Sequence, residues 1–208
     1  MKHSCSHGGY ALITAIVFLV LLSLIALTAL RSSGLEVKSG ANSARRAAAF
    51  EAAEVSRSLV AGLIEPLCRS GGWPTSAGGA VPDSEFPARL PAGLSLVDRD
   101  GSGGPDNWCL EPDSEASFDP DAMDRDAAYH QALPGLQIAG DVAVRRLNTE
   151  ASAGAGQAQG AGYAGIGIGV AGGGGHIHFY LRSRGAERSE QAEASATTSA
   201  VYRQVIRR

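Results

Sequence analysis

The sequence predicts an α+β fold in which a long N-terminal helix packs on a small C-terminal antiparallel β-sheet. Two observations predict the helix. Residues 10–30 form an unbroken apolar run, and a helical periodicity follows it without a proline before Pro66. A third observation, the alternation of apolar and polar residues near the C-terminus, predicts the sheet. In a chain of 208 residues, these elements indicate one domain carried on one long helix.

The apolar run from Tyr10 to Leu30 is long enough to cross a membrane. It contains 21 uncharged residues, which span about 32 Å as a helix at 1.5 Å per residue. A buried helix of a soluble protein would show a polar face, whereas the polar side chains here are Thr14, Ser23 and Thr28. The sequence therefore predicts a transmembrane helix over residues 10–30.

The first nine residues predict a leader that is not an ordinary secretory signal. A secretory signal places its apolar region before a small-residue cleavage site. Here the small residues Gly8 and Gly9 come before the apolar run. This order favours cleavage on the cytoplasmic side of the helix, and we expect residues 1–9 to be removed.

Residues 31–65 predict an amphipathic continuation of the helix outside the membrane. Gly34 and Gly40 are weak points that each cost about 1 kcal/mol relative to Ala, and Pro66 is expected to end the helix. The predicted apolar stripe is Val37, Ala41, Ala44, Ala48, Ala52, Val55, Leu59 and Leu63.

Residues 66–208 predict a loop-rich globular β domain. The chain has 27 glycines and only 6% aromatic residues, which indicates a small core with many loops. Cys68 and Cys109 fall in this region, and an exported domain would be oxidised. We predict that they form a disulfide, with two free thiols as the alternative.

Residues 83–126 contain twelve acidic residues against three arginines, which indicates a solvated loop region. Within it, Asp98, Asp100 and Asp106 resemble the start of a calcium loop, since Ca²⁺ takes several oxygen ligands on a tight turn. The pattern lacks the later ligands, because Ser102 and Cys109 occupy those positions. We therefore interpret the segment as an acidic turn, with calcium binding as the alternative, and predict no metal site.

Four segments predict strands, and the segments between them predict loops. The predicted strands are Leu90–Val97, Leu136–Leu147, His176–Arg184 and Ala192–Ile206. The predicted loops and turns are Cys68–Pro82, Phe118–Tyr129 with a short helix, Asn148–Gly175 and Gly185–Gln191.

The remaining motifs do not predict chemistry. The glycine-rich segment Gly165–Val170 lacks the strand and helix context of a phosphate loop. His176 and His178 share a strand face, but no third metal ligand accompanies them, so they are interpreted as surface residues. The chain has no GxSxG or HExxH motif, and its net charge of −3 does not favour nucleic-acid binding. We predict a protein that is not an enzyme and has no cofactor.

The N-terminal region resembles that of the PilX-type minor pilins of type IV pili. The elements that carry the resemblance are Gly9-Tyr10-Ala11-Leu12-Ile13, the apolar run, Leu30-Arg31-Ser32-Ser33, and Ala47-Ala48-Ala49-Phe50-Glu51-Ala52-Ala53-Glu54. Together they cover roughly residues 8–60. A weaker resemblance to closing strands of such proteins lies in His178–Gly185 and Ala200–Arg203.

The resemblance implies processing and partners. It implies cleavage by prepilin peptidase after Gly9, with cleavage after Gly8 as the alternative, and N-methylation of Tyr10. Major pilins carry a glutamate at mature position five, where this chain has Thr14. In pilin-like families the lack of this glutamate is associated with tip subunits. The implied partners are other minor pilins, the major pilin, prepilin peptidase, the assembly platform and membrane lipid.

The leading interpretation is therefore a minor pilin that primes assembly of the filament or forms part of its tip complex. The implied location is the inner membrane, with a periplasmic C-terminal domain, and the pilus at the cell surface. The alternatives are a type II secretion pseudopilin of the tip complex and a membrane-anchored exported enzyme. A charged residue at Ala48 or Ala52 is expected to block incorporation without unfolding the domain.

Overall fold

The structure is a computed structural model that describes residues 8–99, 101, 103–111, 124–133, 136–151, 175–189 and 192–206. The first seven leader residues and the glycine-rich segment Gly165–Val170 lie outside the described residues. The chain divides into two compact units, Met1–Ala44 and Arg45–Arg208. Their boundary falls within the helix α1, Gly8–Ser70.

In the first unit, α1 carries the apolar run with its side chains exposed. The hydroxyl groups of this run are satisfied by the helix itself. Thr14 donates to the carbonyl oxygen of Ala11 at 3.0 Å, and Ser23 donates to that of Leu19 at 2.7 Å. Because these polar groups need no water, the helix is compatible with a hydrocarbon environment. It also continues through Gly34 and Gly40 without interruption.

The expected end of the helix at Pro66 is wrong, because α1 continues to Ser70. A proline inside a helix loses one backbone hydrogen bond, and here the following turn has other support. Ser70 donates to the carbonyl oxygen of Pro66 at 3.0 Å, and Leu67 is fully buried. The helix stops at Gly71, whose φ of 74° lies in the left-handed region.

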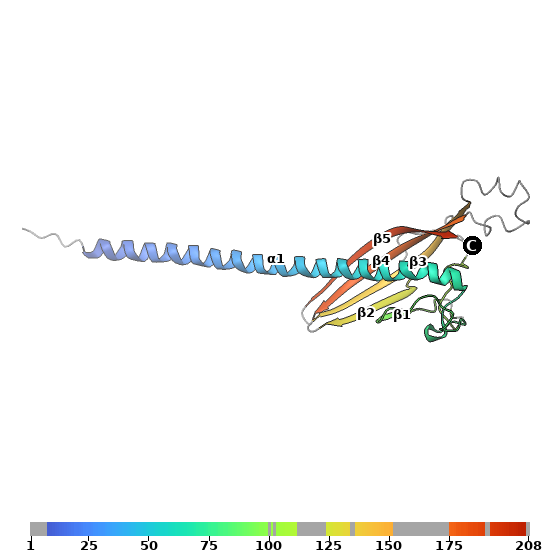
Figure 1. The fold of residues 1–208 in the computed structure, drawn as a ribbon. Coiled ribbons are helices and arrows are strands. Elements are labelled where there is room, and N and C mark those ends of the chain that lie inside the picture. The colour runs from blue at the N-terminus through green and yellow to red at the C-terminus, as the bar shows by residue number, and fades with distance from the viewer. Residues whose placement is uncertain are drawn as a thin grey trace, which may run out of the picture. The chain divides into compact units, whose positions relative to one another are not determined.

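The second unit packs residues 45–70 of α1 on a five-stranded sheet (Figure 1). The strands follow each other in the order β1-β2-β3-β4-β5, and every neighbouring pair is antiparallel. This arrangement confirms the predicted α+β fold. The strands are β1 Leu94–Leu96, β2 Ala127–Leu133, β3 Leu136–Ala151, β4 Gly175–Ser189 and β5 Ala192–Ile206.

Several predicted loop segments are wrong in part. The predicted loop Asn148–Gly175 is strand at both ends, because residues 148–151 belong to β3 and Gly175 belongs to β4. The predicted turn Gly185–Gln191 is strand as far as Ser189, and Ala127–Tyr129 belongs to β2 rather than to a loop. Glycine is unfavourable inside strands, so local sequence favours a turn at Gly185. Its place in the sheet has a tertiary cause, the contact with α1.

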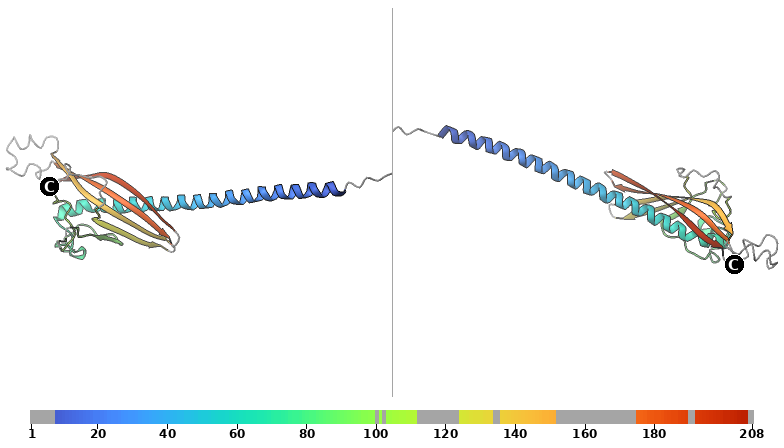
Figure 2. Two further views of the ribbon diagram at one scale, coloured as in Figure 1. Left: turned by 180° about the vertical axis from the view of Figure 1, so that it is seen from behind. Right: turned by 90° about the horizontal axis from the view of Figure 1, so that it is seen from above.

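The helix approaches the sheet so closely that side chains are excluded from two positions on it. A Cβ atom at Gly185 would lie 2.0 Å from the carbonyl oxygen of Ala49, and one at Gly140 would lie 2.4 Å from Oγ of Ser56. Ser56 and Ser183 share a buried hydrogen bond of 2.8 Å across the same interface. Figure 2 shows this part of α1 running along the sheet. Small residues on both elements therefore permit the contact.

The predicted apolar stripe of the helix is partly wrong. Val55 is 44% exposed, whereas Ala49 and Ala53, which are not in the stripe, are fully buried. Each step of four residues turns 40° further around the helix, so a stripe with repeated steps of four drifts away from one face. The residues that are buried against the sheet are Ala49, Ala52, Ala53, Ser56, Val60, Leu63, Ile64 and Leu67.

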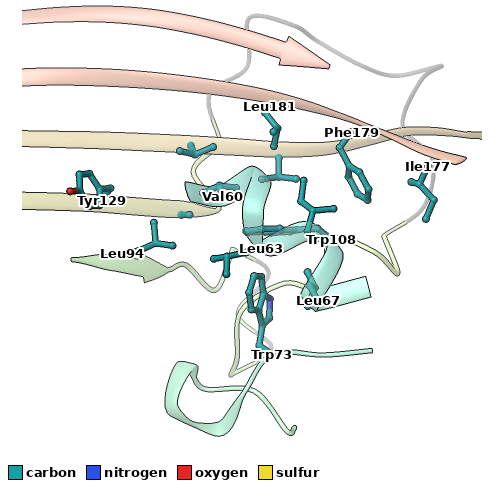
Figure 3. Close-up of a cluster of buried hydrophobic side chains, with 14 of the residues drawn as sticks. Val60, Leu63, Leu67, Trp73, Leu94, Trp108, Tyr129, Ile177, Phe179 and Leu181 are labelled. Carbon is teal, nitrogen blue, oxygen red and sulfur yellow. The ribbon is translucent and has the colours of Figure 1, made fainter. Parts of the chain in front are cut away.

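The hydrophobic core lies where the end of α1, the sheet and the loop after the helix meet (Figure 3). Trp73 and Trp108 are 2% and 1% exposed, and their rings meet edge to face with centroids 4.8 Å apart. Phe179 and Leu181 of β4 complete it from the sheet. Trp108 is thus a core residue. Because the chain has few aromatic residues, each large ring that is buried contributes much of the apolar area of a small core.

The close helix–sheet contact predicts opposite effects for two glycine substitutions. Gly185→Ala should lower the free energy of unfolding by about 3 kcal/mol, because the added methyl group must push α1 away from β4. Gly62→Ala should raise it by about 0.5 to 1 kcal/mol, because this helix position has nothing within 4 Å of the new atom. Urea unfolding of the full chain in detergent, followed by tryptophan fluorescence, measures both. Equal effects of the same sign would contradict the proposed packing.

Candidate functional site

Among the described residues, one helix is long and apolar enough to cross a membrane by its length and composition. It is α1, whose most apolar 18-residue window has a mean hydropathy of 2.8 with none of its residues buried. This finding agrees with the membrane anchor expected for residues 10–30.

The residues of the expected cleavage site lie at the beginning of this helix. Gly9 and Tyr10 are both helical, and the side chain of Tyr10 is 76% exposed. Thr14 lies one turn further along, and its hydroxyl group bonds the carbonyl oxygens of Tyr10 and Ala11. It therefore presents no carboxylate to a neighbouring helix.

Beyond the apolar run, α1 carries large apolar side chains that are exposed. In the first unit these are Leu35 and Val37, which are 68% and 70% exposed. In the second unit they are Phe50 and Val55, on the side of α1 that does not face the sheet, with exposures of 52% and 44%. Exposed apolar side chains of this size are typical of interaction surfaces.

The predicted disulfide is present between Cys68 and Cys109, whose Cα atoms are 5.4 Å apart. It joins the last turn of α1 to the loop that carries Trp108. In the chain-entropy model, closing a loop across 41 residues stabilises a fold by about 4 kcal/mol. The bond therefore holds the end of the helix and the loops after it together.

Side chains reinforce the same connection. Trp73 donates its ring N–H to the carbonyl oxygen of Asp106 at 2.8 Å, and Asn107 donates to that of Gly71 at 2.8 Å. From β3, Arg146 donates to the carbonyl oxygens of Cys109 and Glu111 at 3.1 and 2.9 Å. The loop is thus tied to both the helix and the sheet.

Three carboxylates from distant parts of the acidic segment converge on the guanidinium of Arg99. Its nitrogen atoms lie 3.2 Å from Asp106, 2.9 Å from Glu111 and 3.2 Å from Asp126. Asp126, immediately before β2, also accepts the backbone N–H of Val144 at 2.7 Å. The Arg99 cluster, defined by these four charged residues, therefore joins the acidic loops to the sheet.

Burial controls the electrostatics of the Arg99 cluster. The side chains of Asp106 and Asp126 are 6% and 0% exposed. Burial raises the pKa of Asp126 above its ordinary value, although Val144, Arg145 and Arg99 oppose the rise. Burial likewise raises the pKa of Glu111, with Arg99 again opposing it. Arg99 is thus the largest opposing influence at Glu111, whereas at Asp126 the backbone N–H of Val144 and the charge of Arg145 oppose desolvation more strongly than Arg99 does.

Three carboxylates of the Arg99 cluster lie close enough together to hold a metal ion, but the guanidinium of Arg99 already pairs with all three. Ligand oxygens of Asp106, Glu111 and Asp126 lie within 4.8 Å of one another. The guanidinium of Arg99 lies between them. A divalent cation would have to displace or approach a fixed positive charge, which Coulomb repulsion disfavours. We therefore interpret the cluster as structural.

The acidic turn that resembles a calcium loop uses its first carboxylate on its own backbone. The two oxygens of Asp98 accept the N–H groups of Gly101 at 2.7 Å and Gly103 at 2.9 Å. Asp100 and Ser102 lie outside the described residues. The role of Arg99 was not predicted from the sequence. The one available signal was that Arg99 is one of only three arginines among the twelve acidic residues of residues 83–126.

The two strand histidines lie on the face of β4 that points away from α1. His178 is half-buried, and its Nδ1 atom lies 2.9 Å from Oδ1 of Asn148 on β3. His176 is half-buried two residues earlier on the same face. This arrangement agrees with their interpretation as surface residues of a strand.

A comparison with known protein families matches residues 8–56 to the PilX N-terminal family. The matched segment contains the apolar run and the exposed and buried faces of α1 described above. No curated relative and no solved structure matches the chain.

The match of residues 8–56 to the PilX N-terminal family supports a role as a minor pilin of the type IV pilus. It fits a membrane-anchored pilus component, and it implies interaction with other pilus components. Pilin families are in general structural rather than catalytic.

The Arg99 cluster predicts a pH-dependent effect of losing its cation. Arg99→Met should lower the free energy of unfolding by about 3 kcal/mol at about pH 7, because the buried carboxylate of Asp106 loses its ion pair and Asp126 keeps only Arg145 and the N–H of Val144. It should also raise the pKa values of Asp126 and Glu111 further. A folded state that binds protons more readily than the unfolded state gains stability as pH falls, so the loss should shrink toward about pH 5.

The measurement is urea unfolding of the full chain in detergent at both pH values. Arg89→Met makes the same charge change at an exposed residue, and it should change the free energy of unfolding by less than about 0.5 kcal/mol. A loss for Arg99→Met that is independent of pH would contradict the role assigned to the cluster.

Proposed function

We propose that this chain is a minor pilin that primes type IV pilus assembly or forms part of the tip complex. The observation that carries the proposal is the family match over residues 8–56, which coincides with an exposed apolar helix. The anchor would lie in the inner membrane with Arg45–Arg208 in the periplasm. Its partners would be the other minor pilins, the major pilin and the assembly platform.

The residue at Thr14 supports a position at the filament tip. A carboxylate in the hydrocarbon region is costly unless it is paired, and the major pilins use theirs to meet a neighbour's N-terminal amine. Thr14 instead bonds the backbone of its own helix. A subunit without this carboxylate does not need that partner, which suits a subunit that begins a filament.

The burial of residues along α1 supports different roles for two faces of the helix, one packing on the sheet and the other contacting neighbouring subunits. Ala49, Ala52 and Ala53 face the sheet and are buried, whereas Phe50 and Val55 are exposed on the other side. The expectation that a charge at Ala52 would spare the domain is therefore wrong, because Ala52 is 2% exposed. We assign filament packing to the exposed face.

The alternative of a type II secretion pseudopilin depends on the acidic turn as a calcium site. Asp98 is engaged by the N–H groups of its own turn, and Arg99 fills the neighbouring carboxylate cluster. No observation among the described residues therefore favours this alternative over the pilus.

The proposed processing predicts a defined change in mass. In cells with prepilin peptidase, intact mass and N-terminal sequencing of the extracted protein should show loss of residues 1–9 and a methylated Tyr10. In cells without the peptidase, Met1 should be retained. Retention of Met1 in both strains would overturn the assignment to the pilin class.

The proposed packing face predicts the effect of a charge at Phe50. Phe50→Asp should reduce recovery in sheared filaments by about tenfold or more, because a desolvated carboxylate would face the apolar filament core. Its free energy of unfolding should change by less than about 0.5 kcal/mol, because the side chain is exposed. Glu51→Lys, the adjacent change at an exposed charged residue, is the control and should be recovered normally. Equal recovery of both variants would exclude this face.

A further inference from the structure

The two edges of the sheet are unequal. At one edge, β1 contains three residues and follows Pro91 and Gly93. At the other edge, β5 contains 15 residues, and all of them pair with β4 on one side. In the described sheet, β5 has no strand on its other side (Figure 1). A long row of backbone N–H and C=O groups is therefore available there.

The edge formed by β5 lacks the features that usually prevent strand pairing. Natural edge strands are kept apart by prolines, bulges, short length or charged side chains. The strand β5 contains no proline, and its register with β4 has no shift. Its charged residues, Glu193 and Arg203, stand near its two ends. The segment Ala194–Tyr202 between them is uncharged and extends for about 30 Å.

The side chains of β5 leave room for an added strand on both faces. The row that faces α1 contains the small, half-buried residues Ala196, Thr198 and Ala200. The opposite row contains Ser195, Thr197 and Ser199, all exposed. Opposed side chains on neighbouring strands meet within about 5.5 Å. A segment of small or β-branched uncharged residues would therefore fit beside β5.

Charged residues of α1 that flank β5 already have partners. Glu54 lies near Thr198 and forms an ion pair with Arg57. Glu65 lies near Tyr202 and forms an ion pair with Arg69. Because each carboxylate already has an arginine as its ion-pair partner, the added segment does not need a basic side chain to pair with it. The recognition would come mainly from backbone hydrogen bonds, as in strand addition generally.

Symmetric pairing of two copies through β5 conflicts with the membrane anchor. A two-fold contact makes the two β5 strands antiparallel, and it reverses the helix segment that lies along the sheet in one copy relative to the other. Two subunits that are anchored in the same membrane and belong to one filament would not take opposite orientations. An added strand must come from a different polypeptide or a different segment.

We propose that β5 accepts an extended, uncharged strand from a neighbouring subunit of the filament tip, which continues the sheet across the subunit interface. This inference rests on the proposed function for the identity of the partner. The occupied length is Ala194–Tyr202, and the interaction is made by the outward backbone groups of that segment.

Hydrogen exchange of individual backbone amides tests the strand addition directly. The probe is the full chain, compared in detergent and in sheared filaments. In detergent, alternate amides of Ala194–Tyr202 should exchange rapidly, because about half of the N–H groups on an edge strand point outward. In filaments these same amides should exchange at least about 100-fold more slowly. The amides of β1, at the opposite edge, should not change.

The amides of α1 separate failure of this inference from failure of the proposed function. Slower exchange in α1 without any change in β5 would overturn the strand addition while leaving the pilin role intact. Absence of the chain from sheared filaments, or unchanged exchange in both elements, would overturn the proposed function and this inference with it.

A pair of lysine variants provides a second test. Ala196→Lys places a charge on the row that faces α1, where an added strand would bury it. Ser195→Lys places the same charge on the solvent-facing row, where it stays hydrated. Recovery in filaments should fall about tenfold or more for Ala196→Lys only. Urea unfolding should show that both variants fold, and equal recovery of the two would contradict the inference.

Discussion

The rest of the structure depends on the close approach of α1 to the sheet. Gly185 and Gly140 leave space for the backbone and for Ser56, and the buried hydrogen bond between Ser56 and Ser183 fixes the contact. Dispersion and burial of small residues require such short distances, since a gap would forfeit much of the attraction. This contact gives the sheet one covered face, sets which side of the helix remains exposed, and leaves the long strand β5 beside α1.

The loops after the helix have little regular structure, and they are held by a few strong connections instead. The disulfide Cys68–Cys109 joins them to α1, and Arg146 joins them to β3. The guanidinium of Arg99 pairs with Asp106, Glu111 and Asp126 of the acidic segment, and Arg145 of β3 pairs with Asp126 as well. A small domain with few aromatic residues thus obtains order from covalent and ionic links where apolar burial is limited.

These features give different parts of the chain different roles in the proposed minor pilin. Residues 8–56, which match the PilX N-terminal family, carry the exposed helix face and would supply the membrane anchor. The sheet, and the loops that the disulfide joins to the end of α1, would supply the surface presented to neighbouring subunits. Among the surfaces of the described sheet, the edge of β5 is unusual because it combines length with lack of charge. Assembly through helix packing and through strand addition would then use separate elements.

Local patterns in the sequence were sufficient for the helix, the strand β5, the first part of the strand β4 and the cysteine pair. The apolar run and the alternation in His176–Arg184 are periodic patterns of burial, and the period of a pattern can be read directly from the sequence. Tertiary contacts decided the rest. Gly185 is in a strand because α1 passes over it, and α1 continues beyond Pro66 because Leu67 is buried and Cys68 is cross-linked. Arg99 meets carboxylates that are distant in sequence. None of these depends on neighbours along the chain, so no local pattern encodes them.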